Sequence, residues 1–198
     1  MEIKYKHIIS LGFFCSVASE LKRIGIRDCS SPFDWVISED IFKIIQLINN
    51  NFKDFLSINY LEQNKNYPNY YKNIKYKIQF FHDFNEHQTC EEQLPTIQEK
   101  YNRRINRLYE NIKEPTLFIR YIYNQQEYDN IEKNIDIILK NLKKYNINNN
   151  IVFVANSDIK ISKLNLFIVD KDKDKPVART FLEKNKKLEE YLINSIYK

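Results

Sequence analysis

The stretch HIISLGFFCSVASELKRIG, residues 7–25, decides the fold because it predicts a strand, a turn and a helix in direct succession. Residues 7–11 form a short apolar run that predicts a buried strand, and Gly12 closes it with a tight turn. Apolar residues at helical spacing follow, and Gly25 ends their pattern. A buried strand that turns directly into a helix is typical of α/β proteins.

The same alternation of apolar runs and helical stripes continues along the chain. Further strands are predicted at residues 76–81, 117–119, 151–155 and 164–169, and further helices at residues 41–48, 91–113, 131–142 and 181–196. Because the strands are continuous apolar runs, we predict a three-layer α/β fold: a mainly parallel sheet of about five strands with helices on both faces. The Tyr- and Asn-rich segment 57–75 has no clean period, so we expect a long surface loop there.

Length and composition limit the classes of protein that fit. No Pro/Gly/Ser-rich linker interrupts the 198 residues, so we predict a single α/β domain over residues 1–198. The net charge of +5 is the small difference between 31 basic and 26 acidic residues, which does not favour a nucleic-acid partner.

The cysteines and the hydropathy bear on the cellular setting. Cys15, Cys29 and Cys90 lack the spacing of a zinc site and are odd in number, which indicates a reducing, cytoplasmic setting. No segment approaches the roughly 18 apolar residues of a membrane span, so we expect neither secretion nor membrane insertion. We predict no metal and no cofactor, and the oligomeric state stays open.

Polar residues follow the predicted strands, where ligand sites of parallel sheets lie. Gly12 and Cys15 follow the first strand, His82 and Asp83 the second, and Arg120 the third. A thiol nucleophile, an imidazole base, an orienting carboxylate and an anion-binding guanidinium could therefore meet at one edge of the sheet. This expectation requires the first and second strands to be neighbours.

Cys15 has two interpretations. In a strand-to-helix turn its thiol would lie near helix N-terminal amides, which would lower its pKa, and His82 could accept its proton while Asp83 orients the ring. Alternatively, Cys15 is a small buried apolar residue beneath Phe13 and Phe14. Residue types alone favour neither interpretation.

Other polar residues also allow two roles. Arg103 and Arg104 belong to a basic helical stripe that is either a solvated face or a binding site for a phosphate or carboxylate. In SSPFDW, residues 30–35, the aromatic residues are expected to pack a corner, whereas Asp34 and the preceding Arg27 could line a pocket. His82 and His87 also allow a metal site with Asp83 and Glu86, but a dedicated site usually presents three ligands in fixed geometry.

Six segments together resemble a known family. They are SLGFFC (10–15), LKRIGIR (21–27), SPFDW (31–35), FHDF (81–84), KYNRRINRL (100–108) and LFIR (117–120). The order resembles a bacterial and viral domain-of-unknown-function family described as papain-like cysteine peptidases, and the similarity spans residues 8–121. The resemblance implies a thiol hydrolase with Cys15 as nucleophile and His82 as base. The chain lacks the CGSCW-like segment of papain itself, so the residues transfer more directly than the reaction.

The leading functional hypothesis is a cysteine-dependent hydrolase or acyl transferase acting on a small-molecule or peptide-like substrate that could be anionic. The alternative is a non-covalent binding or transferase domain for an anionic or sugar-linked small molecule, using Arg120 and the Arg103 and Arg104 stripe. A third hypothesis is a structural or interaction module whose polar strand ends are only caps and turns.

Overall fold

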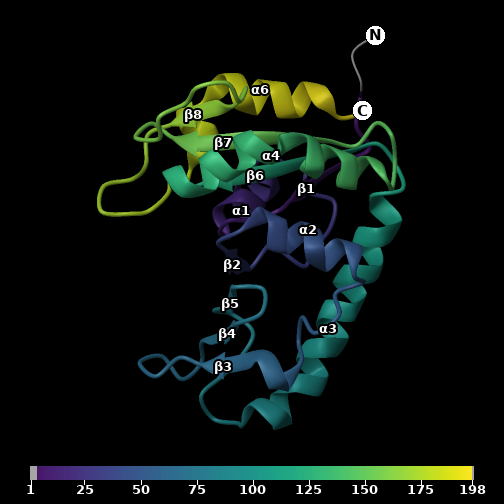
Figure 1. Ribbon diagram of the computed structural model, residues 1–198, viewed down its shortest axis with the longest axis vertical. Coiled ribbons are helices and arrows are strands. Elements are labelled where there is room, and N and C mark those ends of the chain that lie inside the picture. Colours follow the sequence, from purple (N-terminus) through teal and green to yellow (C-terminus); the bar gives the residue numbers. More distant parts are fainter. Residues whose placement is uncertain (1–3, 198) are drawn as a thin grey trace.

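The computed structural model describes residues 4–197 and divides the strands between two sheets (Figure 1). The parallel sheet has the order β1-β6-β7-β8 and consists of β1 (His7–Ser10), β6 (Thr116–Ile122), β7 (Asn150–Asn156) and β8 (Phe167–Val169). The antiparallel sheet has the order β2-β5-β4-β3 and consists of β2 (Val36–Ser38), β3 (Leu61–Gln63), β4 (Tyr71–Asn73) and β5 (Ile78–Phe80).

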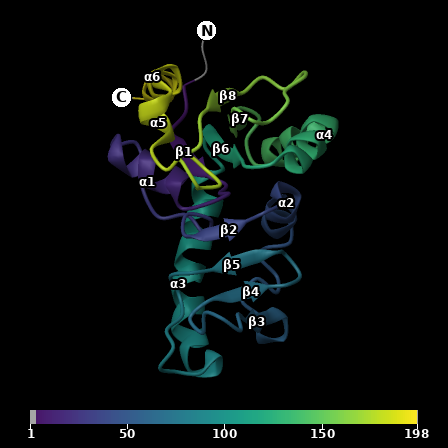
Figure 2. The same ribbon diagram turned by 90° about the vertical axis from the view of Figure 1, so that its left-hand side faces the viewer.

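The helices join and cover these sheets. They are α1 (Ser16–Arg23), α2 (Ile41–Asn49), the 3-10 helix η1 (Ile58–Tyr60), α3 (Cys90–Asn111), α4 (Gln125–Lys143), α5 (Phe181–Lys184) and α6 (Lys186–Ser195). Helix α3 begins in a capping box, in which Thr89 and Glu92 each bond the other's backbone amide. With 22 residues it is about 33 Å long, and it runs along the antiparallel sheet up to the parallel one (Figure 2).

Both faces of the parallel sheet are buried against apolar residues. Successive side chains of a strand point to opposite faces, and in β6 Phe118 belongs to one apolar cluster while Leu117 and Ile119 belong to another. The first cluster includes α2 and α4, and the second includes α1, α5 and α6. Figure 2 shows these two groups of helices on opposite sides of the strands. The first cluster also reaches Phe80 of the antiparallel sheet, so one apolar core connects the two sheets.

The α/β class is confirmed, but the strand count and membership differ from the prediction. The parallel sheet has four strands rather than about five, because the predicted strand 76–81 forms β5 of the antiparallel sheet. Segment 57–75, expected to be a loop, contains η1, β3 and β4. These strands are three residues long, too short for a period of two to be visible, and β3 is largely exposed.

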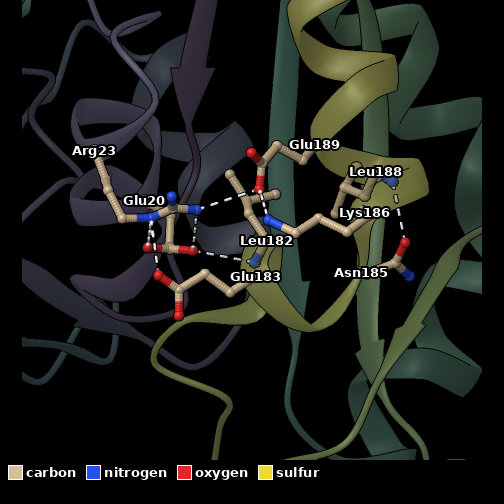
Figure 3. Close-up of polar contacts among 8 residues, drawn as sticks. All are labelled: Glu20, Arg23, Leu182, Glu183, Asn185, Lys186, Leu188 and Glu189. Carbon is tan, nitrogen blue, oxygen red and sulfur yellow. Dashed lines mark hydrogen bonds and ion pairs between the residues drawn. The ribbon is translucent and has the colours of Figure 1, made fainter.

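The C-terminal helices are fastened to α1 by a polar network around Glu20 (Figure 3). The Glu20 side chain is only 4% exposed and accepts hydrogen bonds from Arg23 Nε at 2.7 Å and from the backbone amide of Leu182 at 3.1 Å. Arg23 also pairs with Glu189 of α6 at 3.4 Å. A buried carboxylate with two such donors fixes the start of α5 against α1.

Candidate functional site

The turn between β1 and α1 places Cys15 at the carboxyl end of the parallel sheet. Cys15 is the N-cap residue of α1, its side chain caps no backbone amide, and its thiol is half-buried. Two backbone hydrogen bonds hold the turn: Ser38 N–H donates to the Phe13 carbonyl at 3.0 Å, and Tyr121 N–H donates to the Gly12 carbonyl at 3.2 Å. The turn therefore lies at the edge where ligands usually bind in such sheets.

Gly12 is required at this turn by its surroundings. Its φ is +83°, and a Cβ added there would lie 2.3 Å from Ser38 Oγ and 3.0 Å from Arg120 Nη1. Only a residue without a side chain fits this close approach in a left-handed conformation. Gly12 was one of the residues expected at the ligand-binding edge of the sheet as part of a substrate site, and the structure gives its identity a structural reason.

Arg120 forms a closed internal clamp. Its side chain is fully buried, and Nε and Nη2 donate to Glu127 Oε1 at 2.9 and 2.5 Å. Nη1 donates to the Leu11 carbonyl and Ser38 Oγ, each at 2.7 Å, and Nη2 donates to the Ser38 carbonyl at 2.6 Å. These five bonds use all five guanidinium N–H donors. The structure thus gives Arg120 an internal acceptor for every donor and leaves none directed at the substrate anion that was predicted for it.

The Cys15 thiol does not have the lowered pKa that the helix N-terminus alone would produce. Burial raises the pKa of Cys15, and the positive charge of Arg179 and the backbone amide of Cys15 itself only partly offset this. Because burial disfavours the thiolate, a nucleophilic role for Cys15 needs a base that takes up the thiol proton.

His82 lies beyond β5 on the antiparallel sheet, not beside Cys15. Its ring is exposed and meets Trp35 edge-on, with ring centroids 6.2 Å apart. No hydrogen bond links it to Cys15 within residues 4–197. The expectation that the first and second predicted strands are neighbours is wrong, because β1 pairs with β6 and β5 pairs with β2 and β4. The sequence of β5, only three residues long, does not reveal that this strand belongs to a second, antiparallel sheet.

Asp83 is engaged away from the His82 ring. Its carboxylate is 2% exposed, and its two oxygens accept from Lys100 Nζ at 2.5 Å and Tyr101 Oη at 2.8 Å. The contact with α3 anchors the loop after β5. Within residues 4–197 the Asp83 carboxylate accepts from these two α3 side chains and makes no hydrogen bond with His82, the contact that the predicted orienting role requires.

Arg27 and Asp34 form a buried ion pair near the Asp83 contact. Asp34 is 2% exposed, and it accepts from the Arg27 guanidinium and from the Ser31 backbone amide at 2.8 Å. Burial raises the pKa of Asp34, while Arg27 and, more weakly, Arg104 lower it. The Arg27 guanidinium also lies 5.7 Å from the Trp35 ring. The two predicted pocket residues thus pair with each other, beside a cavity of about 10 Å³ that they help to line.

The basic stripe of α3 divides into an outer and an inner residue. Arg103 is exposed and pairs with Glu99 at 2.6 Å, as expected of a solvated face. Arg104 turns inward, with its guanidinium 5.1 Å from the Tyr101 ring, and its Nη1 is buried without a hydrogen-bond partner. The side chains that sequence reasoning missed are Tyr101 and Ser38, which organise the buried contacts, and Arg179. Tyr101 was visible in the helical pattern only as one member of the apolar stripe.

Across residues 4–197, no three His, Cys, Asp or Glu side chains are arranged to hold a metal ion. Within the same residues, no helix has both the length and the apolar character needed to cross a membrane.

The fold and the site define an α/β protein with a cysteine in the turn from its first strand to its first helix. The model of the family described as "Putative papain-like cysteine peptidase (DUF1796)" matches residues 6–158, so the chain belongs to that family and the resemblance seen in the sequence is confirmed. An uncharacterized protein of Acanthamoeba polyphaga mimivirus, R408, is 30% identical over 171 residues, which cover 75% of this chain and 77% of that protein. No solved structure matches the chain.

Proposed function

We propose that this protein is a cysteine-dependent hydrolase or acyl transferase with Cys15 as its nucleophile. The observation that carries the proposal is the position of Cys15, a half-buried thiol at the N-cap of α1 and at the carboxyl end of β1. The family description supports the same class of chemistry. Cysteine hydrolases place their nucleophile near helix N-terminal amides because these stabilise the developing negative charge.

The reaction follows from the chemistry of a thiol. The Cys15 proton passes to a base, and Sγ attacks the carbonyl carbon of an amide, ester or thioester. The bond to the leaving group breaks, and that group takes up the proton. Water then attacks the resulting thioester and releases a carboxylic acid with the free thiol, or another acceptor takes the acyl group.

His82 is our proposed base. Its ring is exposed, and within residues 4–197 neither ring nitrogen makes a hydrogen bond, so no protein group blocks the nitrogen that would accept the thiol proton. Cys15 follows β1 of the parallel sheet, and His82 follows β5 of the antiparallel sheet. The exposed loop after β5 would therefore have to approach α1 when substrate binds. Catalytic contacts often form fully only in the substrate complex.

The substrate we propose is a small molecule or a peptide-like acyl donor. We propose that the protein acts on it in the cytoplasm. Three cysteines that form no disulfide in the structure agree with a reducing compartment. The single-domain organisation predicted from the sequence remains part of this proposal.

The proposal is tested by acetylation with p-nitrophenyl acetate, followed by mass spectrometry of peptides containing each cysteine. We expect an acetyl thioester on Cys15, loss of turnover in Cys15→Ser, and a loss of roughly 100-fold in His82→Gln if that ring is the base. Cys29→Ser and Cys90→Ser are the matched controls and should turn over normally. Equal acetylation of all three thiols would remove the basis for Cys15 as nucleophile.

A further inference from the structure

The segment that precedes α5 packs in the same apolar cluster as the Cys15 turn, since Val177 and Ala178 share that cluster with Phe13. This segment is outside residues 6–158, which match the family model. On one side of Arg179, the Ala178 backbone amide donates to Tyr121 Oη at 2.9 Å. On the other side, the Leu182 backbone amide donates to Glu20 of α1 at 3.1 Å. Tyr121 in turn donates its own amide to Gly12, three residues before Cys15. Arg179 is therefore held between an anchor on β6 and an anchor on α1.

The Arg179 guanidinium is exposed and has no ion pair or hydrogen bond within residues 4–197. The nearby carboxylate of Asp172 accepts the Arg179 backbone amide at 2.9 Å and pairs with Lys184 Nζ at 2.5 Å. Lys184 thus balances the Asp172 charge. The Arg179 guanidinium is in no such pair among the described residues, and its positive charge acts both on the Asp172 carboxylate and on the Cys15 thiol.

Two features of α1 add to this positive region. The first turn of the helix contains no acidic side chain, so nothing on it neutralises the positive end of the helix dipole. Ser16, directly after Cys15, is 3% exposed, and its Oγ is buried without a hydrogen-bond partner. A buried hydroxyl without a partner is costly, which points to a group that is bound there in the working protein.

We propose that Arg179 is a specificity residue of the Cys15 site that attracts substrates carrying an anionic group, such as a carboxylate, next to the bond attacked. The assignment rests on the proposed function in one respect, that Cys15 is the reacting thiol. It adds the class of substrate, and it assigns a role to the chain beyond residue 158. Arg179 acts by attracting and orienting the anion and by favouring the thiolate form of Cys15.

Two alkylating reagents of similar size but different charge test the proposal. The Cys15 thiolate displaces iodide from either neutral iodoacetamide or anionic iodoacetate, and mass spectrometry follows the rate at each cysteine. We expect Arg179→Gln to lower the iodoacetate-to-iodoacetamide rate ratio at Cys15 by about two- to threefold at low salt, the effect of removing one nearby charge in water. The difference should shrink in 1 M salt, where the screening length is about 3 Å.

Arg179→Lys should retain most of the wild-type ratio because it keeps the charge. Lys175→Gln is the matched control, since Lys175 is an exposed cation in the same segment. The Cys29 and Cys90 rates report any general loosening of the fold. If Cys15 reacts readily but its ratio is the same in Arg179→Gln, or falls equally in Lys175→Gln, the specificity role is wrong and Cys15 remains the candidate nucleophile. If Cys15 is the slowest thiol with both reagents in the wild-type protein, the proposed function itself fails.

Discussion

Two inward-facing arginines, one in each half of the molecule, show how differently a guanidinium can be used. Arg120 lies in the parallel sheet, is fully buried, and has a protein acceptor for each of its five donors. Arg104 lies on α3 beside the antiparallel sheet, and its buried Nη1 has no partner. A buried cation with every donor satisfied holds the architecture together, whereas one with a free donor contributes less to stability.

The largest expected effect separates these two arginines. Arg120→Met should destabilise the protein by about 3–5 kcal/mol, because it leaves the Glu127 carboxylate buried without its counter-ion. Arg104→Met should cost about 1 kcal/mol or less, since it removes weaker and partly solvated contacts. Urea unfolding at neutral pH measures both free energies.

A double variant tests whether the unpaired Glu127 carboxylate causes the loss of stability in Arg120→Met. Arg120→Met combined with Glu127→Leu should be more stable than Arg120→Met alone, because the unpaired charge is removed together with its partner. Similar losses of stability in Arg120→Met and Arg104→Met would contradict this comparison, because a guanidinium with all five donors bonded should contribute more to stability than one with an unpartnered donor.

Replacing the two glycines with positive φ, Gly12 and Gly25, should destabilise the protein less, and Gly25 serves as the control because its surroundings are open. Gly25→Ala should cost about 1–2 kcal/mol, the strain of a left-handed alanine, because no atom lies within 4 Å of the added Cβ. Gly12→Ala should cost about 1–3 kcal/mol more, because Ser38 and Arg120 would have to move. Thermal or urea unfolding checks the difference, and equal losses would mean that the Arg120 clamp shifts without cost.

The smallest effect concerns a polar anchor on the surface. Hydrogen bonds from Tyr128, Ser162 and the Lys163 amide lower the pKa of Glu132 to about 2. A lowered pKa stabilises the folded protein above the ordinary Glu value of about 4.3, and this contribution disappears as the pH falls through about 2. Glu132→Gln should therefore speed hydrogen exchange of the Lys163 amide at pH 4 to 7.

The wild-type protection of that amide should persist at pH 3 and weaken towards pH 2. Asp136→Asn, at an exposed position of the same helix, is the control and should leave the exchange rate of Lys163 unchanged. A wild-type protection that already falls between pH 5 and 4 would show that Glu132 has an ordinary pKa.

Several elements could be predicted from the sequence because their signals are long or local. Apolar residues recur at helical spacing from Leu94 to Ile112, over about five turns. The structure places helix α3 at Cys90–Asn111, close to the predicted 91–113. The runs at 117–119 and 151–155 lie within β6 and β7, where burial on both faces leaves no polar alternation. The Cys15 turn was predictable because a strand, a glycine and a helix adjoin in the chain.

The partners of the polar residues could not be predicted, since they depend on contacts far apart in sequence. Arg120 follows the apolar run 117–119 and suggested a ligand site, but its acceptors come from Leu11, Ser38 and Glu127. Asp83 follows His82 directly, yet its donors lie on α3, 17 and 18 residues further on. Because His82 and Asp83 adjoin in the chain, they suggested a His–Asp pair, but Asp83 bonds Lys100 and Tyr101 of α3 instead.

The pairing of β1 has a consequence for how the chain is made. His7 of β1 pairs with Thr116, and β1 has no other neighbour in the parallel sheet than β6. On a ribosome, the chain must be made at least as far as β6 before this strand can pair. Until then its backbone N–H and C=O groups and its apolar side chains have no native partner. We therefore expect chaperones to shield the newly made segment around β1.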